Sequence, residues 1–148
     1  MKDLIKAYLK EVSAITAQGD AREESYYPAL KQLFEGYPLE KGRKTQVTVL
    51  PKKTEAGSPD FRVWDGKDFI VGYIEAKTPG TNLDQIETSK QLQRYLSTFP
   101  NLILTDFYEF RLYRDGKLMQ NATIARQFTA KVLKATPQVE QALSLIHI

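Results

Sequence analysis

Two acidic residues and one lysine lie along a segment whose other residues are typical of β-strands. Asp60 precedes the run FRVW, and Glu75 and Lys77 stand at the end of the run FIVGYIEAK. Carboxylates are costly to bury, and they repel each other when they share one face of a sheet. A hard cation such as Mg²⁺ removes both costs, because it accepts oxygen ligands from one or two carboxylates together with water and phosphate. These residue types suit a phosphodiesterase in which a cation stabilises charge on the phosphate and lowers the pKa of a bound water, with Lys77 to orient or deprotonate that water or to neutralise charge.

The turn between the two runs decides whether the three side chains meet. Asp65-Gly66 is a strong signal for a tight hairpin turn. A loop of two or four residues places Asp60 opposite an odd-numbered residue of the second strand, which is the parity of Glu75 and Lys77. With the four-residue loop, Asp60 and Glu75 are diagonal neighbours with Cα atoms about 7–8 Å apart. A loop of odd length, or a bulge at Gly72, would break this prediction.

The spacing of apolar residues predicts the elements that position these side chains. The order of the predicted elements favours an α/β domain in which helices cover a sheet. Helices are expected at 4–15, 20–36, 84–99 and 136–148, and strands at 45–51, 61–64, 69–77, 101–106 and 108–119, the last containing an Asp-Gly turn.

The start of the second helix is ambiguous in the sequence. Asp20 is a candidate N-cap, and Glu23 stands in the capping-box position relative to it. Pro28 fits badly inside a helix, so the helix either begins later or bends there.

Composition restricts the class of protein. The chain of 148 residues is 42% apolar, which is enough for one core and leaves little room for two. It contains no cysteine, which excludes disulfides, zinc ribbons and thiol nucleophiles and favours the cytoplasm as the compartment. The first residues resemble neither a signal peptide nor a membrane span. A net charge of +3 suits a nucleic-acid partner without requiring one.

Several motifs resemble one family of nucleases. GSPDFRVW followed by GYIEAK resembles the PD-(D/E)xK motif of restriction-endonuclease-like nucleases, and QLQRYL resembles a glutamine–tyrosine helix motif of several branches of that superfamily. The longer pattern from REESYYPAL through EAKTPGTNLDQIE to PNLILTDFYEFRLYRDG is similar to the N-terminal nuclease domain of large single-chain restriction-modification enzymes that carry an adenine-specific DNA methyltransferase. This resemblance covers residues 22–116.

The resemblance implies a fold and an activity. The fold is a restriction-endonuclease-like mixed central sheet flanked by helices, and the activity is Mg²⁺-dependent hydrolysis of double-stranded DNA in phage defence, with Mn²⁺ able to substitute. Asp60 and Glu75 match the metal-binding acids, the carbonyl of Ala76 matches a further ligand, and Lys77 matches the catalytic lysine. An idle site that only positions DNA for the methyltransferase, and a structural cluster of salt bridges, are the two alternatives.

Two further residues are candidates for the same site. An acid on the preceding helix often completes such sites, and helical phase favours Glu23 over Glu24, because Glu23 lies on the apolar stripe of its helix. A capping role for Glu23 is the competing interpretation. The resemblance places Gln91 and Tyr95 one helical turn apart and facing the site, where Gln91 would hold the lysine, a water or a DNA phosphate; Tyr95 also belongs to the apolar face of its helix.

The remaining expectations concern organisation and partners. Residues 1–148 are expected to form a single nuclease-like domain with its core at about 20–135 and a truncated C-terminal end. Methyltransferase and target-recognition domains are expected in the full-length chain, and no membrane partner is expected. A basic cluster either follows a phosphate backbone or is a solvated surface; it comprises Lys41, Arg43, Lys44, Lys52 and Lys53.

Overall fold

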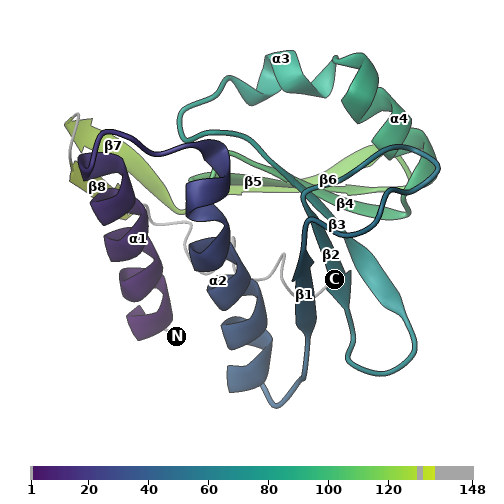
Figure 1. Cartoon of the computed structure of the whole chain (residues 1–148), viewed down its shortest axis with the longest axis horizontal. Coiled ribbons are helices and arrows are strands. Elements are labelled where there is room, and N and C mark those ends of the chain that lie inside the picture. Colours follow the sequence, from purple (N-terminus) through teal and green to yellow (C-terminus); the bar gives the residue numbers. More distant parts are fainter. Residues whose placement is uncertain (1, 130–131, 136–148) are drawn as a thin grey trace.

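A six-stranded sheet runs through the centre of the molecule (Figure 1). The computed structural model describes residues 2–129 and 132–135. The strand order is β1-β2-β3-β4-β5-β6, and every neighbouring pair is antiparallel except β3 and β4, which are parallel. The strands are β1 Gln46–Val49, β2 Phe61–Trp64, β3 Ile70–Ala76, β4 Asn101–Thr105, β5 Glu109–Arg114 and β6 Lys117–Thr123.

Helices cover the sheet on its two faces, as the sequence predicts. One core lies between the sheet and the N-terminal helices, and the other lies beneath the two helices that connect β3 to β4. The helices are α1 Lys2–Ala17, the 3-10 turn η1 Glu23–Tyr26, α2 Tyr27–Glu40, α3 Leu83–Glu87 and α4 Lys90–Thr98. The predicted mixed sheet flanked by helices is therefore confirmed.

The second helix begins later than its predicted start at Asp20. A 3-10 turn precedes it, and Pro28 lies in the first turn of α2, where a missing backbone N–H costs nothing. The backbone N–H of Arg22 donates to the hydroxyl of Ser25, so the predicted capping box of Asp20 and Glu23 is wrong. Glu23 therefore does not act as a capping residue.

The β2–β3 turn is wider than predicted. It spans residues 65–69, and one carboxylate oxygen of Asp65 accepts hydrogen bonds from the backbone N–H groups of three of them. An odd loop alone would put the acids on opposite faces, but a bulge beyond Val63 restores the parity. Phe61 pairs with Ile74, so one further step places Asp60 directly opposite Glu75, and the predicted diagonal relation is wrong.

Two other segments are divided more finely than predicted. The helix expected at 84–99 is broken into α3 and α4, because Ser89 caps α4 by accepting a hydrogen bond from the N–H of Leu92. The segment 108–119 contains all of β5 and the start of β6, which are joined by the turn at Asp115-Gly116. A small sheet of β7 Ala125–Thr129 and β8 Val132–Ala135 was not predicted, and the helix expected at 136–148 lies outside the described residues.

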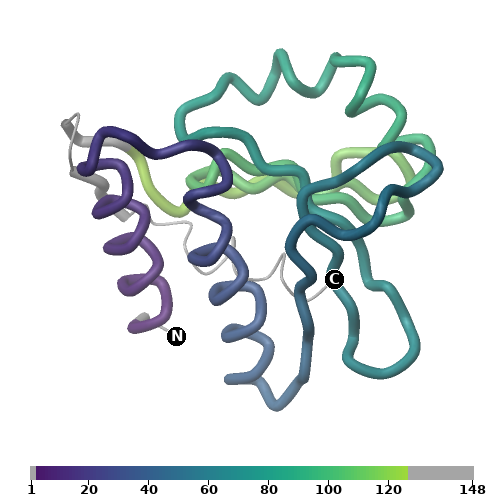
Figure 2. Tube along the Cα trace, viewed as in Figure 1, coloured from purple at the N-terminus to yellow at the C-terminus, as the bar shows by residue number. Residues whose placement is uncertain are grey.

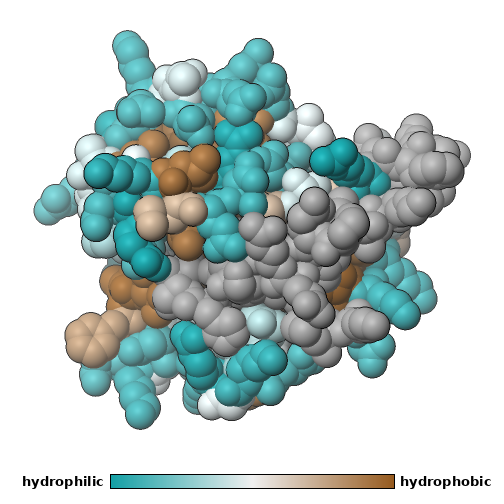
Figure 3. Space-filling view, turned by 180° about the vertical axis from the view of Figure 1, so that it is seen from behind, coloured by the Kyte–Doolittle hydropathy of each residue, from teal (hydrophilic) through white to brown (hydrophobic). Residues whose placement is uncertain are grey.

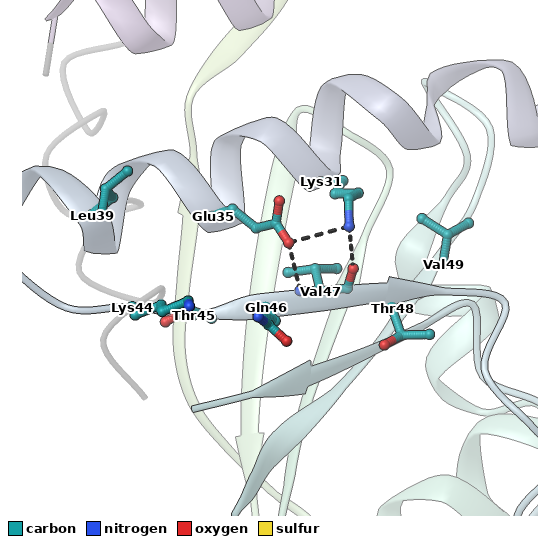
Figure 4. A pocket seen from close by; sticks show the side chains of 9 residues that line it. All are labelled: Lys31, Glu35, Leu39, Lys44, Thr45, Gln46, Val47, Thr48 and Val49. Atoms are coloured by element: carbon teal, nitrogen blue, oxygen red, sulfur yellow. Dashed lines mark hydrogen bonds and ion pairs between the residues drawn. The ribbon is translucent and has the colours of Figure 1, made fainter. Parts of the chain in front are cut away.

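The free edge of β1 is covered by two side chains of α2 (Figure 4). Lys31 and Glu35 form an ion pair at 3.2 Å. Glu35 accepts a hydrogen bond from the N–H of Val47 at 2.8 Å, and Lys31 donates to the carbonyl of Val47 at 2.6 Å. A hollow of about 720 Å³ lies along the same edge, away from Asp60 and Glu75. The pair supplies the donor and the acceptor that a seventh strand would otherwise provide at Val47.

The exposed apolar side chains are scattered rather than gathered into one patch. Seen from behind, the coloured surface is mostly hydrophilic, with small separate hydrophobic areas (Figure 3). No helix in the described part of the chain has the length and apolar character needed to cross a membrane. The large exposed apolar residues are Leu39, Leu50, Phe69, Ile70, Leu118 and Met119.

Candidate active site

Asp60 and Glu75 meet where β2 begins and β3 ends. Oδ2 of Asp60 accepts a hydrogen bond from the N–H of Ala76 at 2.8 Å, which ties the carboxylate of Asp60 to the end of β3. The carbonyl of Asp60 accepts from the N–H of Leu50 at 2.7 Å, which ties its backbone to the end of β1. Asp60 is thus held by contacts to both strands that flank β2.

Glu75 is a buried carboxylate with only one partnered oxygen. Its side chain is 4% exposed, and the ammonium of Lys77 lies 3.2 Å from Oε2. Oε1 is buried and has no hydrogen-bond partner among the described residues. Burial and the charge of Asp60 raise the pKa of Glu75 to about 8, and Lys77 opposes this shift. Near neutral pH the carboxyl of Glu75 therefore tends to keep its proton beside Asp60 unless a further positive group lies next to it.

Lys77 is anchored by the parallel pairing of β3 and β4. Its N–H donates to the carbonyl of Thr105 at 2.9 Å, directly beyond the last pair of the ladder, Ala76 with Thr105. The backbone position leaves the long side chain free to fold back onto Glu75, two residues earlier on the same face. The sheet therefore brings Asp60, Glu75 and Lys77 together, as the sequence predicts.

Glu23 lies near the same site and comes from the layer of N-terminal helices. The hydroxyl of Tyr27 donates to Oε1 of Glu23 at 3.0 Å. Burial and then the charge of Asp60 raise the pKa of Glu23, whereas the hydrogen bond from Tyr27 and the charge of Lys77 lower it. These mutual effects show that Glu23 lies within electrostatic range of Asp60 and Lys77.

Tyr27 lies in the candidate site and was not predicted from the sequence. Burial and a hydrogen bond to Asp60 raise the pKa of Tyr27 well above its ordinary value. Its hydroxyl thus lies between the carboxylates of Glu23 and Asp60. Its position four residues after Glu23, on the same helical stripe, is the signal that could have identified it.

Gln91 and Tyr95 are placed differently from each other. Gln91 is exposed on α4. Tyr95 is fully buried, and its hydroxyl has no hydrogen-bond partner of ordinary geometry within the described residues, although a weak side-chain hydrogen bond with Gln91 lowers its pKa. Burial and the charges of Glu75 and Asp60 raise the pKa of Tyr95 to about 12. Tyr95 thus lies beside the acids, and Gln91 lies at its outer side.

The loop before Asp60 is fastened to α4. Figure 2 shows this segment between β1 and β2 running up toward the green helical region. Nε of Arg94 donates to the carbonyl of the buried Ala56 at 3.3 Å. Gly57 has φ +126, and a Cβ there would lie 3.4 Å from the ring of Tyr95, so the backbone passes close over that ring. The contacts of Ala56 and Gly57 with α4 therefore hold the loop segment that leads to Asp60.

The donor set fits a hard divalent cation with few protein ligands. The acids of the site offer carboxylate oxygens, and the buried Oε1 of Glu75 has no partner among the described residues. Oxygen ligands of this kind suit Mg²⁺ better than Zn²⁺. Among the described residues, no group of three or more His, Cys, Asp and Glu side chains is arranged to hold a metal ion. A cation here would therefore be held mainly by Asp60 and Glu75.

The predicted basic cluster falls into two parts. Lys41 lies over the ring of Tyr37, and residues 42–45 line a hollow of about 430 Å³ with the β2–β3 loop. Lys52 and Lys53 are exposed beyond the other end of β1, in the loop that leads to Asp60. Only this second part adjoins the site.

The comparisons with known proteins concern the fold. No family model and no curated protein sequence matches this chain. The cryoEM structure of a DrdV–DNA complex is similar, with a TM-score of 0.72 and 24% sequence identity over 99% of this chain. The match spans only 14% of the DrdV chain. The two chains therefore share the mixed sheet and its flanking helices, which is consistent with the restriction-endonuclease-like fold that the sequence motifs predict.

Proposed function

We propose that residues 1–148 form a metal-dependent endodeoxyribonuclease domain of the restriction type. The observation that carries this proposal is the buried carboxylate of Glu75, which stands opposite Asp60 with one oxygen unpartnered and with Lys77 3.2 Å from the other. A structural salt bridge would be expected to partner both oxygens of a buried carboxylate.

Asp60 and Glu75 would hold Mg²⁺ or Mn²⁺, with the carbonyl of Ala76 as a further ligand. Glu23, which belongs to no three-acid metal group in the described structure, would have to move closer to bind the cation directly or act on it through water. Such a cation supplies positive charge to a phosphodiester and acidifies water. The hydrogen bond from Ala76 to Asp60 fixes one oxygen of this carboxylate and leaves the other for a ligand role. Tyr27 holds Glu23 toward the same point.

Lys77 is the group suited to act on the substrate. Its side chain is 23% exposed, so the ammonium is held by Glu75 and still accessible from solvent. In that place it can neutralise charge that develops on the phosphate, or orient the attacking water. Its backbone bond to Thr105 keeps the chain rigid where this side chain emerges.

Double-stranded DNA is the proposed substrate. The DrdV chain was solved in a complex with DNA, and this chain shares its fold over 99% of the present length. The sequence resemblance adds methyltransferase and target-recognition domains in a longer chain, a cytoplasmic location and a role in phage defence to the proposal. The alternative is a catalytically idle module that positions DNA for an adenine-specific methyltransferase.

Nicking of supercoiled plasmid by the purified chain tests the proposal. We expect nicking with Mg²⁺ or Mn²⁺, none with EDTA, and a loss of at least about 100-fold in Lys77→Ala, because general acid–base groups contribute about 10²–10⁴-fold. Lys10→Ala, which removes an exposed lysine of α1, should cleave like wild type. DNA binding without cleavage under any condition would favour the idle module instead.

A further inference from the structure

One face of β1 and β2 is left partly open beside the candidate active site. On the face toward α2, Val47, Phe61 and Val63 are buried. The residues that alternate with them form what we name the β1–β2 outer face, and they are only partly buried or exposed. Asp60 continues this alternation by one step, so the face leads directly to the acids. The β1–β2 outer face comprises Gln46, Thr48, Arg62 and Trp64.

Arg62 has fewer partners on this face than a half-buried arginine needs. Nη2 donates to the hydroxyl of Thr48 at 3.1 Å. Nε is buried without a hydrogen-bond partner, and Arg62 forms no ion pair within the part of the chain that the structure describes. A guanidinium that has lost water and gained no counter-ion is costly, so an anion from outside the chain would stabilise it.

Arg111 shows how the same chain satisfies an arginine that serves the fold. Its three donor nitrogens contact Asp84, Glu87 and Glu109 at distances of 2.8–3.2 Å. These contacts bind α3 to β5. Arg62, with one neutral hydroxyl in place of three carboxylates, does not have the surroundings of a structural arginine.

A phosphate is the anion that fits the place of Arg62. The guanidinium is a planar fork of donors that matches phosphate oxygens. Asp60 lies two residues before Arg62, just ahead of β2, and continues the same face. The spacing of about 6.6 Å for two extended residues is comparable to that between neighbouring phosphates of a DNA strand. The exposed Lys52 and Lys53 add positive charge in the loop between β1 and Asp60.

We propose that Arg62 binds a phosphate of the DNA backbone next to the phosphate whose bond would be cleaved at Asp60 and Glu75. This inference rests on the proposed DNA substrate. It assigns the β1–β2 outer face as the floor along which one DNA strand approaches the site, and it makes Arg62 a binding residue that has no part in the structural ion-pair network.

Fluorescence anisotropy of a labelled DNA duplex, measured with EDTA over a series of salt concentrations, tests the inference without cleavage. We expect Arg62→Met to bind about tenfold or more weakly, in keeping with a hydrogen bond to a charged group, and its salt slope to fall by about one. Arg62→Lys should keep the slope and lose part of the affinity. The matched control, Lys10→Met, removes one positive charge from the exposed surface of α1 and should leave both unchanged.

Thermal unfolding separates this role from a structural one. Arg62→Met should melt no lower than wild type, because the change removes a guanidinium that lacks a counter-ion. A lower melting temperature together with unchanged DNA affinity would assign Arg62 to the fold and overturn the inference. Equal affinities and slopes for Arg62→Met and Lys10→Met would also overturn it while leaving the proposed function intact. Failure of the wild-type chain to bind DNA in this assay would overturn the inference, and failure to nick plasmid with Mg²⁺ or Mn²⁺ as well would overturn the proposed function.

Discussion

Three carboxylates share one end of the sheet, and only a few groups offset their repulsion. Lys77 pairs with Glu75, the N–H of Ala76 donates to Asp60, and the single hydroxyl proton of Tyr27 serves both Glu23 and Asp60. When all three acids are ionised, one ammonium leaves an excess of negative charge, which a proton on Glu75 or an added cation would offset. Ionisation of all three acids without such a cation therefore costs the folded chain stability.

Replacement of one acid should relieve this repulsion. In EDTA, Asp60→Asn should be as stable as wild type or more stable by about 1 kcal/mol, which corresponds to about 2–4 °C. The amide oxygen can still accept the hydrogen bond from Ala76, while the charge that raises the pKa of Glu75 and of Glu23 is removed. Calorimetry against Asp68→Asn, which removes an exposed acid of the β2–β3 loop, provides the comparison. A clearly lower melting temperature for Asp60→Asn would identify a structural salt-bridge cluster.

Tyr27 and Tyr26 allow a matched test of positioning. Each is buried, and each hydroxyl is hydrogen-bonded to side chains: that of Tyr26 to Thr16, and that of Tyr27 to Glu23 and Asp60. Tyr27→Phe and Tyr26→Phe should each cost about 0.5–1.5 kcal/mol of stability. Only Tyr27→Phe should also weaken the stabilisation that added Mg²⁺ gives, because Glu23 would no longer be held toward Asp60. Identical Mg²⁺ titrations of the two variants would remove Tyr27 from the site.

At the scale of elements, periodicity predicted what was repetitive and missed what depends on single contacts. The helical stripe of α1 and the alternation of β1, β2 and β3 were predicted, because burial of one face imposes a period. The register of the β2–β3 pairing was not predicted, because it depends on single contacts. Three hydrogen bonds to Asp65 select a five-residue turn, and a bulge after Val63 then returns Asp60 to the face of Glu75. The odd or even spacing of two residues can predict that they share a face of the sheet, but it does not say which residue pairs with Asp60.

The covered edge of β1 supports a prediction about assembly. Glu35→Ala should leave the N–H of Val47 without an acceptor and destabilise the chain by about 1–2 kcal/mol. The free edge should also favour pairing between molecules, seen as concentration-dependent association in sedimentation. Glu24→Ala removes an exposed acid of η1 and should do neither. A monomeric and fully stable Glu35→Ala chain would show that the ion pair is dispensable for protecting this edge.

At the scale of the whole molecule, the candidate site forms only where separate layers meet. Glu23 and Tyr27 come from the N-terminal layer, Asp60 and Glu75 from the sheet, and Tyr95 from α4 in the opposite layer. Residue type and spacing predicted Asp60, Glu75 and Lys77, and the family resemblance together with helical phase added Glu23. Sequence reasoning could not identify Tyr27 as a member of the site, or the buried hydroxyl of Tyr95 as unpartnered, because these facts depend on how the layers pack.

A site shared between layers couples cation binding to the stability of the whole domain. A ligand that binds only the folded chain stabilises it by about 2.7 kcal/mol at 100 times its Kd. Mg²⁺ should therefore raise the melting temperature of wild type by about 5–10 °C at such a concentration. Asp60→Asn and Glu75→Gln should lose this gain, whereas NaCl of equal ionic strength should not produce it in wild type. Because the measurement needs no DNA and no cleavage, an equal response of wild type and both variants would locate any Mg²⁺ binding outside Asp60 and Glu75, whatever the chain does to DNA.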